Sequence, residues 1–87
     1  MSDEHTFETT LLWPADPVQE KPPVATYSRD SVLGSPGHAD IPGSAPTVFG
    51  GVASRYNPEE LLTLALSECH MLTFLSLASK RQVPVPA

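Results

Sequence analysis

The stretch of sequence that decides the fold is NPEELLTLALSECHMLTFLSLASKR, residues 57–81. Asn57 is a favoured N-cap, because its side-chain oxygen accepts a hydrogen bond from a backbone N–H that the helix leaves unpaired. Pro58 then occupies the first helical position, where its missing N–H costs nothing. Glu60 stands where it can close a capping box with Asn57. The sequence therefore predicts one long helix over about residues 58–81.

The interior of this predicted helix is apolar on nearly every side. Its apolar residues are Leu61, Leu62, Leu64, Ala65, Leu66, Cys69, Met71, Leu72, Phe74, Leu75, Leu77 and Ala78. A helix of this kind is buried in a core or in an interface. A membrane span is the alternative, but Glu68 and His70 stand near its centre, where charge is costly. We therefore expect a buried helix and no membrane partner.

The rest of the chain is short for the task of covering this helix. Eighty-seven residues make one domain at most, and small domains bury proportionally little surface. A helix of 24 residues is about 36 Å long, and residues 1–56, which precede it, are rich in proline. We therefore expect that the fold is completed either by a second chain or by a C-terminal half.

Two strands are predicted upstream of the helix. Residues 5–13 and 24–33 are rich in β-formers and partly alternate, so we expect them to pair in antiparallel fashion. Residues 34–56 are punctuated by Pro and Gly and are expected to form a loop, with room for a short edge strand in 39–52. The predicted fold class is α+β: an antiparallel β-hairpin or small sheet followed by one long buried helix.

The charge balance limits the classes of partner. Five basic residues stand against ten acidic residues, which gives a net charge of −5 with no basic cluster. Nucleic-acid binding therefore lacks its electrostatic footprint. No apolar segment follows a positively charged N-terminal region, so no secretory signal is indicated and the expected location is the cytoplasm.

Cys69 is the single cysteine of the chain. It is a buried structural thiol, a nucleophile, or half of an intermolecular pair. His70 follows it directly but points about 100° away on a helix, which disfavours a Cys–His dyad between neighbours. Together with His5 and His38 these residues match no closed zinc spacing. We therefore expect neither a metal nor a cofactor.

Several motifs together resemble the OsmC/Ohr family of thiol peroxidases. They are Tyr27-Ser28-Arg29-Asp30, Ile41-Pro42-Gly43-Ser44, Phe49-Gly50-Gly51, Tyr56-Asn57-Pro58-Glu59-Glu60-Leu61-Leu62 and Ala65-Leu66-Ser67-Glu68-Cys69-His70-Met71-Leu72. The Cys-His-Met sequence is similar to that of the OsmC-like branch. The resemblance covers essentially all 87 residues and implies that residues 1–87 are the N-terminal portion of a single OsmC-like domain, truncated at about half.

This resemblance implies a function and a set of site residues. Members of the family reduce organic hydroperoxides in the oxidative-stress response, take their electrons from a thiol reductant, and form intertwined homodimers with active sites at the subunit interface. Cys69 matches the peroxidatic cysteine, Glu59 the acidic residue ten positions earlier, and Arg29 the arginine that pairs with that acid. The family's resolving cysteine has no counterpart in this sequence, so the implied peroxidase activity belongs to the complete protein.

The chemistry of such a site can be judged from the residue types. A cysteine thiolate attacks the O–O bond and becomes a sulfenic acid. Arg29 could stabilise that thiolate, and Glu59 could orient the guanidinium with two hydrogen bonds. Glu59 cannot reach Cys69 along one straight helix, because ten residues rise about 15 Å. The site therefore requires a helix break or a partner subunit. The alternative function is a non-enzymatic remnant, or a module that associates through its helix without turnover.

Overall fold

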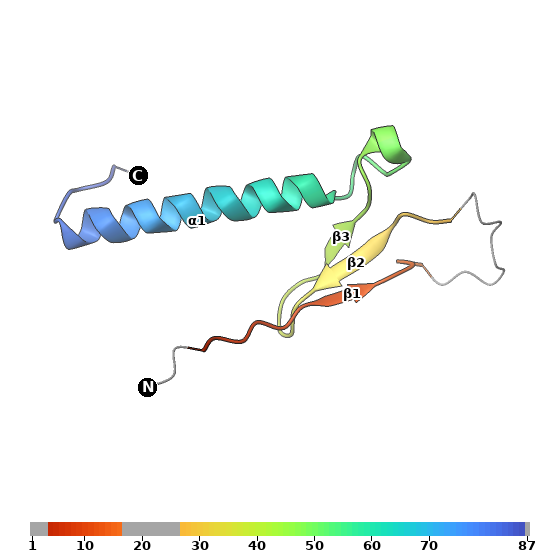
Figure 1. Cartoon of the computed structure of the whole chain (residues 1–87), viewed down its shortest axis with the longest axis horizontal. Coiled ribbons are helices and arrows are strands. Elements are labelled where there is room, and N and C mark those ends of the chain that lie inside the picture. The colour runs from red at the N-terminus through yellow and green to blue at the C-terminus, as the bar shows by residue number, and fades with distance from the viewer. Residues whose placement is uncertain (1–3, 17–26, 87) are drawn as a thin grey trace.

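The computed structural model describes residues 4–16 and 27–86 of the chain (Figure 1). A small three-stranded antiparallel sheet is followed by one long helix, which confirms the predicted α+β class. In chain order the elements are β1 (Thr10–Leu12), β2 (Ser31–Gly34), β3 (Ile41–Gly43), a short 3-10 helix η2 (Thr47–Phe49) and α1 (Pro58–Lys80).

The sheet has the order β1-β2-β3, and both pairings are antiparallel. Leu33 of β2 lies opposite Leu11 of β1 on one side and opposite Ile41 of β3 on the other. The pairing of the first two strands is therefore the one that the sequence predicts. β3 carries Pro42, which has no backbone N–H to donate and is suited to an edge strand.

The strands are shorter than predicted. The strand expected over residues 5–13 is limited to Thr10–Leu12, because residues 5–9 lie beyond the end of the paired part of β2. The strand expected over 24–33 is found at its C-terminal end, as Ser31–Gly34, and residues 24–26 lie outside the described part of the chain. β3 lies within residues 39–52, where the prediction left room for a short edge strand, whereas η2 was not predicted.

The N-terminal end of α1 has the predicted cap. The backbone N–H of Glu60 donates to Oδ1 of Asn57 at 2.8 Å, and the backbone N–H of Asn57 donates to Oε1 of Glu60 at 3.1 Å. These two bonds form a capping box, and Pro58 occupies the first helical position. The start of the helix is therefore specified by four consecutive residues of local sequence.

The C-terminal end of α1 is closed by a Schellman motif. The N–H of Val83 donates to the carbonyl of Ala78 at 2.8 Å, and the N–H of Gln82 donates to the carbonyl of Ser79 at 3.1 Å. Gln82 has φ 56, in the left-handed region where glycine is the usual residue. The helix ends at Lys80, one residue before the predicted boundary.

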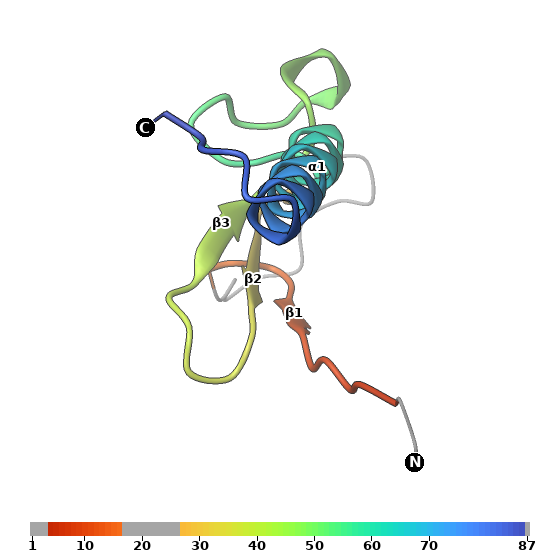
Figure 2. The same ribbon diagram turned by 90° about the vertical axis from the view of Figure 1, so that its left-hand side faces the viewer.

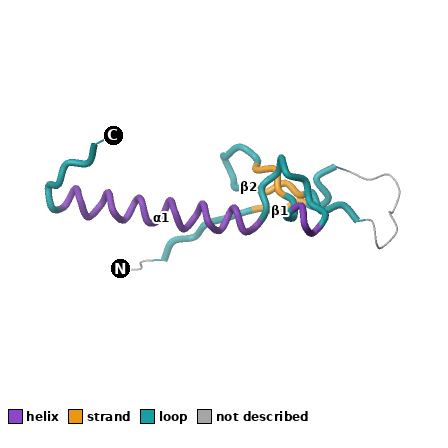
Figure 3. The backbone as a smooth tube through the Cα atoms, turned by 90° about the horizontal axis from the view of Figure 1, so that it is seen from above, coloured by secondary structure: helices purple, strands orange, loops and turns teal. Residues whose placement is uncertain are grey.

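The prediction that the helix is buried is not met within the single chain. Ala78 is the only buried residue of α1. The large apolar side chains that are more than a third exposed on it are Leu62, Leu64, Leu66, Met71, Leu72, Phe74, Leu75 and Leu77. The reason is geometric: the sheet lies at the N-terminal end of α1, and the helix extends away from it (Figures 1 and 3). The Cα radius of gyration is 18.4 Å, against about 12 Å for a compact chain of this length.

The helix and the sheet are joined at one place. Tyr56 and Gly43 form an isolated parallel bridge, in which the N–H of Ser44 donates to the carbonyl of Tyr56 at 2.8 Å and the N–H of Tyr56 donates to the carbonyl of Pro42 at 2.8 Å. Figure 2 shows α1 nearly end-on, with the sheet to one side of it. The edge of β3 thus carries the residue that directly precedes the N-cap of α1.

By length and composition, α1 could also cross a membrane. The same criterion is met by core helices of soluble proteins, and Glu68 and His70 lie in the middle of this one. The exposed apolar surface of α1 is therefore expected to pack against a further surface. The composition of the helix is compatible with either protein or lipid there.

Candidate functional site

Arg29 and Glu59 line the same open pocket, which has a volume of about 490 Å³. Arg29 comes from the segment that leads into β2, whereas Glu59 lies in the first turn of α1. Trp13 and Tyr27 contribute aromatic walls. Among the described residues, no carboxylate lies within ion-pair distance of Arg29. Arg29 and Glu59 therefore border one pocket without forming an ion pair.

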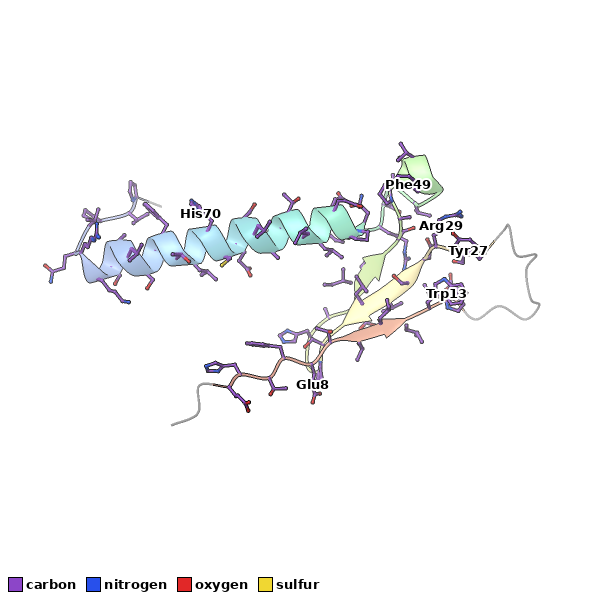
Figure 4. The ribbon with its side chains drawn as sticks, viewed as in Figure 1. Glu8, Trp13, Tyr27, Arg29, Phe49 and His70 are labelled. Atoms are coloured by element: carbon purple, nitrogen blue, oxygen red, sulfur yellow. The ribbon has the colours of Figure 1, made fainter. Side chains whose placement is uncertain are left out.

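The side chain of Arg29 is oriented by its neighbours. Its guanidinium carbon lies 4.4 Å from the centre of the Tyr27 ring, a cation–π contact. Gly50, at φ 87, also lies close, and a Cβ at that position would be only 3.1 Å from the guanidinium carbon. In Figure 4, Tyr27, Arg29 and Phe49 lie together at the end of the molecule where α1 begins. The absence of a side chain at Gly50 leaves room for the guanidinium.

Cys69 lies apart from this pocket. It is exposed on α1 and borders a shallow groove whose lining, which includes Glu68, Leu72 and Lys80, comes entirely from the helix. Cys69 follows Glu59 by ten residues on an uninterrupted helix, which corresponds to about 15 Å along its axis. The structure thus brings together two of the three expected site residues, and it offers no helix break that would bring in the third.

Glu59 also borders a second pocket, of about 750 Å³, on another side of the helix start. Its walls are mainly apolar and aromatic, with contributions from Phe49, Tyr56 and Leu64. A third open space, of about 940 Å³, separates the sheet from α1 and is lined by the apolar residues Leu11, Leu33, Ile41 and Leu61. Apolar surface therefore flanks the Arg29–Glu59 pocket and continues along the inner side of the helix.

Ser44, Asp30 and Arg55 form a polar network beside the pocket, and Ser44 is its centre. Ser44 is only 7% exposed. Its Oγ donates to Oδ1 of Asp30 at 2.9 Å and accepts from the N–H of Val52 at 3.1 Å. These two partners satisfy the buried hydroxyl. Through them, Ser44 links the end of β3 both to the start of β2 and to the segment before α1.

Arg55 is the second connection in this network. Its Nε donates to the carbonyl of Gly43 at 2.8 Å, and its Nη2 donates to the carbonyl of Ser31 at 2.6 Å. The same Nε lies 4.0 Å from Oδ1 of Asp30. These contacts commit the guanidinium of Arg55 to the fold, whereas that of Arg29 contacts the ring of Tyr27 and lies close to Gly50. Sequence reasoning missed the network, and its only signal was the acidic residue that directly follows Arg29.

The histidines and the acidic residues do not assemble into a metal centre. Within residues 4–16 and 27–86, no group of three or more His, Cys, Asp or Glu side chains could hold a metal ion. His70 lies midway along α1, far from the labelled cluster of Tyr27, Arg29 and Phe49 (Figure 4).

No family model, curated protein or solved structure matches this chain. The resemblance to the OsmC/Ohr family consequently stays a prediction, which depends on the motifs quoted above.

Proposed function

We propose that this chain contributes to a thiol-dependent peroxidase that reduces organic hydroperoxides through Cys69 in the oxidative-stress response of the cytoplasm. The observation that carries the proposal is the pocket that Arg29 and Glu59 share. A cation and a carboxylate in one open pocket are the groups that a peroxidatic thiolate needs beside it. The apolar walls around Phe49 and Leu64 suit the organic part of the substrate.

The reaction follows from the residue types. The Cys69 thiolate attacks the terminal oxygen of the hydroperoxide, the O–O bond breaks, and the leaving alkoxide takes a proton to give the alcohol. Cys69 is thereby oxidised to a sulfenic acid while the peroxide is reduced. A thiol reductant condenses with the sulfenic acid, releasing water and forming a mixed disulfide, and a second thiol restores Cys69. Arg29 stabilises the thiolate and the developing alkoxide, and in the assembled site Glu59 pairs with the guanidinium, to which it is not paired in the single chain.

Assembly of this site requires a second copy of the chain. Cys69 and Glu59 are about 15 Å apart on one straight helix, so the thiol at a given pocket comes from the partner of a homodimer. The accessible surface of 7810 Å² supports this, because a folded chain of this size exposes about 5,000 Å². The excess is larger than the roughly 800 Å² that each partner buries in a standard interface.

The second candidate function is an interaction module that associates through α1 without turnover. It is favoured by the exposed apolar side chains of α1 and by the distance of Cys69 from Arg29. In this case Cys69 is an ordinary apolar interface residue. The two functions differ in one property, the rate at which Cys69 reacts with an organic hydroperoxide.

Mass spectrometry of the 87-residue chain after one equivalent of cumene hydroperoxide tests the proposal. We expect one added oxygen on Cys69 or a disulfide-linked dimer, since the sequence has no second cysteine to resolve the sulfenic acid. Arg29→Ala should slow the oxidation by about tenfold or more, because the thiolate loses its cation. Arg81→Ala, at the far end of α1, should leave the rate unchanged. Oxidation of Cys69 no faster than in the urea-unfolded chain would exclude the peroxidase and favour the interaction module.

A further inference from the structure

We infer that Asp30, Ser44 and Arg55 are positioning residues, which hold the first turn of α1, and with it Glu59, at a set place beside Arg29. The inference rests on the proposed function for its chemical purpose, but its geometry stands on contacts of the fold alone. The network joins three segments that are distant in sequence: the start of β2, the end of β3 and the residues before the helix.

Ser44 makes the first part of the connection. Its hydroxyl bonds to Asp30 and to the N–H of Val52, while its own N–H donates to the carbonyl of Tyr56. Tyr56 directly precedes the N-cap Asn57. One nearly buried residue is therefore tied at once to β2 and to the chain that enters α1. Removal of the Asp30 carboxylate would leave the buried hydroxyl of Ser44 without its acceptor.

Arg55 makes the second part. Its guanidinium donates to two backbone carbonyls that belong to different strands, Gly43 of β3 and Ser31 of β2. Only the planar fork of arginine satisfies two such acceptors from one position, so lysine is not an equivalent replacement. Arg55 stands four residues before Glu59, which makes it a short and direct link from the sheet to the helix start.

The sequence positions connect this network to the proposed site. Asp30 directly follows Arg29, and Arg55 and Tyr56 stand four and three residues before Glu59. No strand among the described residues packs extensively on α1, so the bridge and the network are the main restraints on the helix start. Loosening the network should therefore shift Glu59 relative to Arg29 while Arg29 keeps its contact with Tyr27.

Amide hydrogen exchange of the full chain is the first test. Asp30→Asn keeps the shape of the side chain but replaces the carboxylate by an amide, which accepts more weakly from Ser44 and no longer attracts Arg55. It should speed exchange at Ser44 and Tyr56 by about tenfold, because their N–H groups bond across the junction. Asp40→Asn, an exposed acid outside the network, is the matched control and should leave both amides unchanged. Unchanged exchange at both amides in Asp30→Asn would overturn the inference.

The second test measures how close the first turns of α1 lie to Arg29. A nitroxide attached at Thr63→Cys, in a chain with Cys69→Ser, should broaden the backbone signal of Arg29 in the chain with an intact network. Asp30→Asn and Arg55→Lys should each reduce this broadening, whereas Arg81→Lys should not. Equal broadening in all the chains would mean that the helix start is held by other contacts, and the positioning role would be wrong.

The third test separates positioning from general destabilisation. Asp30→Asn should slow the oxidation of Cys69 about tenfold when Glu59 is present, and should have little further effect in a chain with Glu59→Gln. An equal slowing in both backgrounds would show a merely structural role and overturn the inference. If the unmodified chain shows no accelerated oxidation, the proposed function fails, and the exchange and broadening experiments still decide whether the network sets the position of Glu59.

Discussion

The guanidinium of Arg29 is stacked on the ring of Tyr27, two residues earlier in the chain, with 4.4 Å between the guanidinium carbon and the ring centre. In extended backbone, residues two apart lie on the same face, so this contact is built into the local sequence. Arg29 is thus oriented by a neighbour in sequence, whereas Arg55 is oriented by carbonyls of two strands.

The stacking predicts how substitutions of Tyr27 will act. Tyr27→Leu should release the guanidinium of Arg29, at a cost of about 0.5–1 kcal/mol for an exposed cation–π contact. Tyr27→Phe, which keeps the ring, should retain the contact. The measurement is the NMR relaxation of the Arg29 Nε, with faster side-chain motion expected only in Tyr27→Leu. Identical relaxation in both variants would show that the ring does not orient Arg29.

Gly51 should be intolerant of any side chain. A Cβ at this position would meet the carbonyl oxygen of Ala45 at 1.6 Å, a contact that cannot be relieved without moving backbone. Gly51→Ala should destabilise the chain by about 3 kcal/mol in urea unfolding, since overpacking against rigid atoms is costly. Gly37→Ala is the control: unlike Gly51 it has a positive φ, at 81, but nothing lies within 4 Å of the added atom. Its cost should stay near 1 kcal/mol, and a larger loss than for Gly51→Ala would contradict the reasoning.

Gln82 offers a stabilising substitution. It occupies the left-handed position of the Schellman motif that closes α1, where a residue with a Cβ is strained. Gln82→Gly should raise the free energy of unfolding by about 0.5–1 kcal/mol, because the relief of strain exceeds the entropy cost of glycine. Gln82→Ala keeps the Cβ and should give no gain. Thermal unfolding followed by circular dichroism compares the two, and equal stability of both would argue against strain at this residue.

The exposed apolar surface of α1 predicts self-association. At micromolar concentration the chain should sediment as a dimer or larger species. Leu66→Lys should weaken this association at least tenfold, because Leu66 is 63% exposed in the single chain and a charge would have to be buried in the interface. Val48→Lys, which alters an even more exposed apolar residue outside α1, should have no effect. A compact monomer that melts cooperatively would refute this prediction.

The helix was predictable to within one residue because its signals are local. Asn57 and Glu60 cap each other across three residues, and the helix ends within one residue of the predicted boundary. The strands were less predictable, because a strand extends only as far as it has a partner. Residues 5–9 have β-forming composition but lie beyond the pairing of Thr10 with Gly34. β3 contains Pro and Gly, which local propensity assigns to loops, and it exists because β2 offers it a ladder.

The candidate site likewise contains residues that local sequence could predict and residues that it could not. Arg29 and Glu59 were identified from motifs, and the structure brings them to one pocket. The network around Ser44 could not be predicted, because its hydrogen-bonded partners are 8 to 24 residues apart and several of the acceptors are backbone carbonyls. Hydrogen bonds of this kind leave no pattern of residue types. The described part of the chain does not bury α1. The sequence could therefore predict only that the helix needs a further surface to pack against.

Among the described residues, the bridge of Gly43 with Tyr56 and the neighbouring network hold α1 at its N-terminal end, so the helix is a lever that is fixed at one end. A rotation of 10° at Asn57 would displace Cys69 by about 3 Å and the end of the helix at Lys80 by about 6 Å, given the usual rise per residue. The Arg29–Glu59 pocket lies at the pivot and would scarcely move. A surface that packs against the far part of the helix would therefore set the position of the Cys69 sulfur more than the sheet does.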